Sequence, residues 1–317
     1  MTALLEVEKL EVGFGATSAV RGASLAVEPG ETHCLVGESG CGKSVTALAV
    51  MNLLARGARR SAERLVFQGE DLTRLSDAGM ARLRGNAMAM IFQEPMTSLN
   101  PAYTIGSQMT EVLRRHKKAS QRVATDRAAD LLARVGITAP GLRLGQFPHQ
   151  LSGGLRQRVM IAMSLMCDPQ LLIADEPTTA LDVTVQAQIL RLLAGLQRDL
   201  GLGMLLITHD LGIVARVATR VSVMYAGEVV ESAPTAELFA NPRHPYTQGL
   251  LRCVPVPGKI RRDQPLGSIP GTVPKIGPTF EGCGFRERCE FADESCKRAV
   301  PRRKAGATHD YLCRLTP

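Results

Sequence analysis

The first part of the chain alternates between hydrophobic and polar positions in the manner of strands. Residues 5–12 alternate as a half-exposed antiparallel strand does, and residues 25–27 and 33–36 read as further strands. A helix is expected from residue 43 to about residue 54. The N-terminal segment therefore predicts an antiparallel sheet that leads into a helix.

Short, continuous apolar runs follow at residues 88–92, 171–176 and 204–207. Runs of this length are typical of strands that are buried on both faces of a parallel sheet. Other elements are expected around them, namely an amphipathic stretch at 119–135, helices at 159–166, at 183–200 and from 211, and a hairpin of residues 220–225 and 228–232. The pattern predicts an α/β domain with a parallel core.

Residues 37–44 match the phosphate-loop motif G-x-x-x-x-G-K-[ST] over its full length. The predicted nucleotide-binding residues are Gly37, Glu38, Ser39, Gly40, Cys41, Gly42, Lys43 and Ser44. In such a loop the backbone amides surround the β-phosphate, Lys43 reaches the β- and γ-oxygens, and Ser44 binds Mg²⁺. A glycine-rich turn without catalytic function is the alternative for this segment taken alone.

The apolar run at 171–176 ends in two acidic residues, Asp175 and Glu176. A buried strand delivers such carboxylates to the edge of a parallel sheet at which nucleotides bind. We expect Asp175 to hold the Mg²⁺ shell and Glu176 to orient the water that attacks the γ-phosphate. A strand that ends in two solvated acids is the plainer alternative.

A second anion site is predicted at Ser152, Gly153 and Gly154, which precede an apolar helix. The chain already has a phosphate loop, and neither element is complete for hydrolysis alone. The pair therefore suggests two subunits that meet head to tail, so that each seals the nucleotide of the other. An N-cap and turn is the alternative for this motif alone.

The segment L-S-G-G-x-R-Q between a phosphate loop and an L-L-I-A-D-E strand resembles the ATP-binding cassette (ABC) family. The resemblance implies an α/β fold with a RecA-like parallel core, an antiparallel β subdomain and a helical subdomain. It extends over residues 1–255, with the helical subdomain at about 95–165. The activity it implies is ATP hydrolysis.

The resemblance also assigns four further positions, each of which would have an ordinary structural explanation by itself. Gln93 matches the glutamine that senses Mg²⁺ and water and couples to the membrane partner, and His209 matches the switch histidine at the γ-phosphate. Residues 179–182, which end at Asp182, match the loop that touches the opposite subunit. Phe14 occupies the place of the adenine-stacking aromatic, where tyrosine is commoner.

Composition favours a protein that visits a membrane without entering it. The apolar runs fall well short of the ~18 residues that span a bilayer, and residues 1–9 lack the pattern of a secretory signal. The net charge of +8 is compatible with a solvated surface or with attraction to anionic lipid. The four Tyr, eight Phe and absent Trp offer few stacking platforms, and no nucleic-acid motif is present, so we expect no nucleic-acid partner.

Residues 256–317 differ in character and are expected to form a C-terminal extension. The segment from 256 to 277 is rich in Pro, Gly and basic residues, and the last 35 residues hold four of the eight cysteines. These four are Cys283, Cys289, Cys296 and Cys313. Clustered thiols in a small segment of a cytosolic protein point to a metal or cluster that supplies folding energy.

The spacing alone leaves three interpretations of these cysteines open. Four thiolates suit tetrahedral Zn²⁺, although the close C-x2-4-C pairs of zinc sites are missing. Wider loops can surround a [4Fe-4S] cluster. Thiols without any ligand are the third possibility.

A second resemblance favours one of the three interpretations of the cysteines and one class of transported substrate. The segments Q-E-P-M-T-S-L-N-P from Gln93, R-H-P-Y-T from Arg243 and G-C-G-F with R-C near Cys289 resemble the oligopeptide/dipeptide importer ATPases. The resemblance implies a [4Fe-4S] cluster on the four cysteines, with Zn²⁺ as second choice. It also implies peptide transport, although nickel, opine and glycoside substrates remain open, as does a soluble ATPase of a non-transport complex such as a phosphonate-degrading assembly.

The same resemblance implies the partners and the location. It implies a second ABC ATPase subunit, a paralogue rather than an identical copy, in a head-to-tail dimer. Two transmembrane permease subunits and an extracytoplasmic substrate-binding protein complete the implied complex. The chain would then be a peripheral protein at the cytoplasmic face of the cell membrane.

Overall fold

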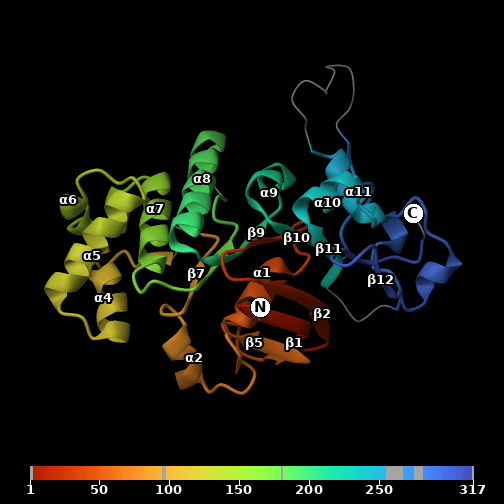
Figure 1. The fold of residues 1–317 in the computed structure, drawn as a ribbon, viewed down its shortest axis with the longest axis horizontal. Helices are drawn as coiled ribbons and strands as arrows, with labels where there is room; N and C mark the ends of the chain where they lie inside the picture. Colours follow the sequence, from red (N-terminus) through yellow and green to blue (C-terminus); the bar gives the residue numbers. More distant parts are fainter. Residues whose placement is uncertain (1–2, 95–97, 180, 255–266, 275–280, 316–317) are drawn as a thin grey trace. The chain divides into compact units, whose positions relative to one another are not determined.

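The computed structural model describes residues 3–94, 98–179, 181–254, 267–274 and 281–315 (Figure 1). Three predicted features lie partly outside these ranges: residues 95–97 after Gln93, Ala180 in the loop that ends at Asp182, and most of the Pro- and Gly-rich segment 256–277. The chain divides into two compact units, the first comprising residues 1–27, 31–73 and 208–317 and the second residues 28–30 and 74–207.

The antiparallel sheet of the first unit has the strand order β2-β1-β5-β6, and β4 also pairs with β1. Its strands are β1 (Leu5–Phe14), β2 (Thr17–Val27), β4 (Ala58–Ser61), β5 (Arg64–Phe67) and β6 (Glu70–Asp71). The strand predicted at 25–27 is therefore the end of a much longer one. Its alternation is interrupted at Gly22, which has a φ of 67°, and the β1–β2 register shifts between Val7 and Leu10 and again between Leu10 and Val12.

The second sheet of this unit runs in the order β12-β13-β11-β10-β3. Its strands are β3 (Thr32–Val36), β10 (Arg220–Tyr225), β11 (Glu228–Pro234), β12 (Arg302–Lys304) and β13 (Asp310–Leu312). Strands β3 and β10 are parallel, and the predicted hairpin of β10 and β11 is antiparallel. Strand β13 pairs with β11, so the C-terminal extension continues this sheet.

Helices and short 3-10 turns complete the first unit. They are α1 (Lys43–Val50), α9 (Leu211–Val217), α10 (Thr235–Ala240), α11 (Pro245–Arg252), η2 (Arg286–Arg288) and η3 (Glu294–Lys297). Helix α1 is shorter than the prediction because the chain turns at Asn52, which has a left-handed φ of 51°. A cluster of aromatic rings from β10, α11 and the extension, Tyr225, Tyr246 and Phe285, packs with ring centroids 4.6 to 5.3 Å apart.

The second unit has three parallel strands in the order β7-β8-β9. They are β7 (Met88–Ile91), β8 (Leu171–Asp175) and β9 (Gly203–Thr208), at the three predicted apolar runs. Its helices are α2 (Asp77–Leu83), α4 (Ile105–Lys117), α5 (Gln121–Arg134), α6 (Pro140–Leu144), η1 (Pro148–Gln150), α7 (Gly153–Ser164) and α8 (Val183–Leu200). Helices α4 to α7 group together (Figure 1), where a helical subdomain was predicted.

No helix among the described residues is long and apolar enough to cross a membrane.

Candidate functional site

The phosphate loop depends on glycine at two positions where the backbone has a positive φ and other atoms crowd in. Gly37 has a φ of 157°, and a Cβ there would lie 2.2 Å from the carbonyl oxygen of Met224. Gly42 has a φ of 107°, and a Cβ there would lie 2.7 Å from the carbonyl oxygen of Ala19. Only glycine fits such positions without moving the backbone, so the motif glycines fix the shape of this loop.

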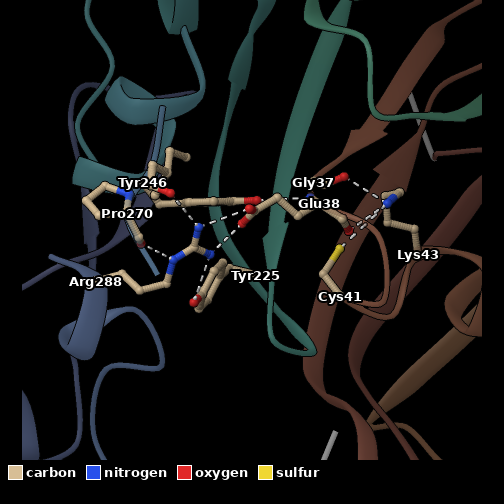
Figure 2. A network of polar contacts seen from close by, with 9 residues as sticks. Gly37, Glu38, Cys41, Lys43, Tyr225, Tyr246, Pro270 and Arg288 are labelled. Atoms are coloured by element: carbon tan, nitrogen blue, oxygen red, sulfur yellow. Dashed lines mark hydrogen bonds and ion pairs between the residues drawn. The ribbon is translucent and has the colours of Figure 1, made fainter. Parts of the chain in front are cut away.

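Lys43 begins α1 and is buried, with 4% of its surface exposed. Its Nζ donates to the carbonyl oxygen of Gly37 at 2.8 Å and to that of Glu38 at 3.0 Å (Figure 2). The N-cap residue of α1 is Gly42, and no side chain caps this end. An ammonium group beside an uncapped helix N-terminus is an arrangement that binds phosphate.

The loop is also held from outside the motif, which the sequence pattern did not predict. The backbone N–H of Glu38 donates to the hydroxyl of Tyr246 at 3.0 Å. Tyr246 lies in α11 and is fully buried, and burial raises the pKa of its hydroxyl, so it stays protonated. The remaining predicted residues of the loop differ in exposure: Cys41 is buried, Ser44 is half-buried, and Ser39 and Gly40 are exposed. The tip of the loop is therefore accessible to a ligand.

The second unit brings together two of the predicted catalytic residues, Gln93 and Glu176. Glu176 Oε2 accepts a hydrogen bond from Gln93 Nε2 at 3.2 Å and another from Thr179 Oγ1 at 3.0 Å. Glu176 has a left-handed φ of 43°, which is unfavourable for a residue with a side chain. Such strain persists where the surroundings hold it and often marks functional residues. Asp175, the last residue of β8, is buried with 4% exposed.

The predicted second anion site forms the start of α7. Ser152 is the N-cap, and its Oγ accepts from the N–H of Leu155 at 3.4 Å. Ser152 is exposed, and Gly153 and Gly154 are half-buried. Asp182 caps α8 in the same unit, with Oδ1 accepting from the N–H of Val185 at 3.0 Å. The N-cap that was the plainer alternative for Ser152 is therefore present, and both capping residues, Ser152 and Asp182, are exposed.

The two remaining nucleotide-site candidates are accessible. His209 directly follows β9 and is exposed. The next residue, Asp210, caps α9 with its carboxylate, which receives the N–H of Gly212 at 2.7 Å. Phe14 ends β1 and leaves 36% of its surface exposed, so its ring is accessible to a ligand.

The four cysteines of the extension, which lie between residues 283 and 313, line one pocket. None of them forms a disulfide. Burial, followed by the other cysteines of the group, raises the pKa of Cys283 to about 11 and also raises the pKa of Cys289. Among the described residues, no group of three or more His, Cys, Asp or Glu side chains is placed so that it could hold a metal ion.

His244 lines the same pocket and has an unusual hydrogen-bond state. Its Nδ1 accepts from the N–H of Tyr246 at 3.0 Å, and burial lowers its pKa to about 3, so the proton of the neutral ring is on Nε2. That Nε2 is buried and has no hydrogen-bond partner in the described part of the chain. The Nε of Arg314, another residue that lines the pocket, is in the same condition.

Comparison with known families matches two regions of the chain. Residues 20–179 match the profile described as ABC transporter. Residues 230–296 match the profile described as oligopeptide/dipeptide transporter, C-terminal region. The second match includes the R-H-P-Y-T segment and three of the four clustered cysteines.

Individual proteins with a similar sequence or fold agree with these profiles. The dipeptide transport ATP-binding protein DppD of Escherichia coli is 50% identical over 304 residues, which cover 94% of this chain and 92% of that protein. The CbiO1 cassette of Clostridium perfringens, part of an ABC transporter complex, has a TM-score of 0.66 at 28% identity and covers 76% of this chain and 92% of that one. A dimeric bacterial ABC transporter cassette has a TM-score of 0.65 at 25% identity and covers 73% and 98%.

Proposed function

Because this chain belongs to the ABC transporter family, whose members hydrolyse ATP, we propose that it is the ATP-hydrolysing subunit of a peptide importer. The observation that carries the proposal is the match of residues 230–296 to the C-terminal region of oligopeptide/dipeptide transporters. A chain 50% identical to a dipeptide transport ATP-binding protein over nearly its full length supports it. Nickel, opine or glycoside import and a non-transport ATPase complex are the alternatives.

The phosphate loop supplies the groups that bind the triphosphate. Lys43 exchanges its carbonyl partners for the β- and γ-phosphate oxygens, and the amides of Gly40 to Ser44 donate to the β-phosphate. The Ser44 hydroxyl, the Gln93 side-chain oxygen and the Asp175 carboxylate are oxygen donors of the kind that Mg²⁺ prefers, so these three residues would hold the ion. The ion, when bound, neutralises charge that develops on the phosphates. Phe14 stacks on the adenine.

Glu176 positions and polarises the attacking water. The carboxylate is oriented by Gln93 and Thr179, so its direction is set before substrate arrives. Gln93 reports the presence of the γ-phosphate to the membrane partner, and His209 contacts the γ-phosphate. Hydrolysis removes these contacts, which lets the cassettes separate.

A second cassette completes the site. Ser152, Gly153 and Gly154 of one subunit seal the nucleotide on the phosphate loop of the other, and Asp182 lies in the loop that faces the opposite subunit. The similarity to a dimeric bacterial cassette supports this arrangement. The second cassette is a paralogue, and two permeases and an extracytoplasmic binding protein complete a complex at the cytoplasmic face of the membrane.

The substitution Glu176→Gln tests the catalytic assignment. We expect the assembled transporter that carries it to bind ATP and to lose at least a hundredfold in hydrolysis rate, because the amide cannot accept the proton of the water. The variant should trap an ATP-bound dimer, which size-exclusion chromatography would detect. The exposed Glu94→Gln substitution in the same unit is the matched control. Hydrolysis at the parental rate in Glu176→Gln would refute the assignment.

The transport assignment has its own test. Copurification with permease subunits, and stimulation of ATP hydrolysis by a peptide-loaded binding protein, are the expected results. A complex that contains no permease would favour the non-transport alternative. Stimulation of ATP hydrolysis by a nickel-loaded binding protein, with none by a peptide-loaded one, would show that the transported substrate is nickel and not a peptide.

We also propose that the four clustered cysteines hold a [4Fe-4S] cluster. The lining of the pocket suits the group chemically in two respects: four thiols line it, and the unpartnered donors His244 Nε2 and Arg314 Nε border it. Cluster sulfurs accept hydrogen bonds, so such donors would be satisfied by the cluster.

Anaerobic purification and metal analysis test this proposal. We expect a brown protein with about four iron atoms for each chain, as a cubane requires. Cys296→Ser should remove the colour and the iron, whereas Cys253→Ser, a half-buried cysteine outside the pocket, should keep both. A colourless protein that contains zinc would overturn the cluster.

A further inference from the structure

We propose that Arg288 of the Cys-rich extension is a positioning residue for the phosphate loop, and that it acts by neutralising and holding Glu38. The folded extension would then be required for tight binding of ATP. This inference rests on the proposed role of the loop in nucleotide binding. Arg288 and Glu38 are 250 positions apart, and both lie in the first unit.

The contact between the two residues is a bidentate ion pair. Arg288 Nη1 donates to Glu38 Oε2 at 2.7 Å, and Nη2 donates to Glu38 Oε1 at 3.0 Å (Figure 2). The Arg288 side chain is 5% exposed and that of Glu38 is 28% exposed. Glu38 raises the pKa of Arg288 well above its usual range, chiefly by the hydrogen bond, so the arginine stays charged. Planar, paired contacts of this kind are stronger and more directional than a simple surface pair.

The rest of the guanidinium group is also held. Nε donates to the carbonyl oxygen of Pro270 at 2.8 Å, Nη2 to that of Ile269 at 3.2 Å, and Nη1 to the Tyr225 hydroxyl at 3.4 Å. With the two bonds to Glu38, all five N–H donors of the arginine have acceptors. A side chain fixed at every donor defines one position for the carboxylate that it binds. Lysine has three donors and no planar fork, so it cannot reproduce this arrangement.

Glu38 is the second residue of the motif, and its negative charge would oppose the binding of phosphate unless a cation neutralises it. Its carboxylate is a negative charge within a loop that binds a triphosphate, and like charges at such range repel. The Arg288 guanidinium neutralises this charge and draws the carboxylate toward the extension. Without Arg288, the carboxylate would be free to turn toward the phosphates, which lowers the affinity for ATP.

The pair also holds the residue that contacts the phosphate-binding lysine, Lys43. The carbonyl oxygen of Glu38 accepts from Lys43 Nζ, and its N–H is bound by Tyr246. The backbone and the side chain of one residue are therefore fixed between the lysine and the extension (Figure 2). Arg288 directly precedes Cys289, whose thiol lines the cysteine pocket. A shift of Cys289 in that pocket would therefore move Arg288 and, through the ion pair, Glu38 of the phosphate loop.

A double-mutant cycle on the full chain tests the proposal, with ATP affinity measured by equilibrium titration. Arg288→Gln should weaken ATP binding about tenfold, the size expected for a partly exposed ion pair with a charge left unpaired. In a Glu38→Gln background the same substitution should weaken it less than about threefold, because no carboxylate remains to repel the phosphates. Arg252→Gln removes an exposed pair with Glu290 in the same unit and should leave affinity unchanged.

Each contrary outcome has a defined meaning. An equal loss from Arg288→Gln with and without the Glu38 carboxylate would overturn charge neutralisation, and so would affinity unchanged by Arg288→Gln alone. A hydrolysis rate at saturating ATP close to the parental value, with only the affinity lowered, is the expected split for a positioning residue. Lys43→Ala tests the nucleotide-binding role of the loop by itself. If this variant keeps the parental ATP affinity, that role is wrong, and the inference about Arg288 fails with it.

Discussion

His309 joins the C-terminal extension to the central sheet of the first unit through a fully buried carboxylate. Its Nε2 lies 2.7 Å from Oε1 of Glu231 in β11, and neither side chain has any exposed surface. The same carboxylate accepts the N–H of Arg243 at 2.6 Å and that of His244 at 2.9 Å. His309→Ala removes one of three donors and opens a cavity. We therefore expect it to destabilise the docking of β13 on β11.

The size of the effect follows from burial. Breaking a buried pair by removing one partner costs about 3 to 5 kcal/mol. Two backbone donors still bind Glu231 after the substitution, which favours the lower end, about 3 kcal/mol. If β13 opens locally, a loss of that size corresponds to amide exchange that is faster by about a hundredfold.

Hydrogen exchange followed by mass spectrometry measures this opening in peptides that cover β13. A local measurement is preferable because a chain of two units need not unfold in a single step. Glu237→Gln is the matched control, because Glu237 is the other partner of His309 at 3.1 Å but its side chain is 36% exposed. It should cost less than about 1 kcal/mol. Equal exchange rates in the two variants would refute the reasoning from burial.

Two further predictions concern the first unit. Gly37→Ala should weaken ATP binding by at least about tenfold, because its Cβ would collide with the Met224 carbonyl; Gly30→Ala, where φ is also positive but no atom lies within 4 Å, is the control for the same titration. In the His33→Gln variant, the free energy of unfolding should decrease less steeply as the pH falls from 6.5 to about 4. Burial lowers the pKa of His33 from 6.5 to about 4, so between these two values the unfolded chain binds more protons than the folded one. The free energy of unfolding therefore decreases as the pH falls through this range. Urea unfolding at several pH values would show no difference in slope if the buried ring does not control it.

Much of the chemistry and of the central fold could be predicted from local sequence. The apolar runs at β7, β8 and β9 and the motif around Lys43 lie where they were expected, and α8 has the predicted bounds. Such features depend on neighbouring residues: an apolar run without polar positions can only be buried, and a glycine-rich turn before a helix can only expose its amides. The roles of the individual site residues remain predictions.

What the sequence by itself determined is therefore the set of elements and the presence of nucleotide-binding chemistry. The tertiary structure decided which distant groups meet: Arg288 with Glu38, His309 with Glu231, and four cysteines at one pocket. It also decided that β13 extends the sheet beside β11. The physical reason is that a charge or a short strand carries no local signal for its partner, because many partners satisfy it equally well until packing brings one of them within reach.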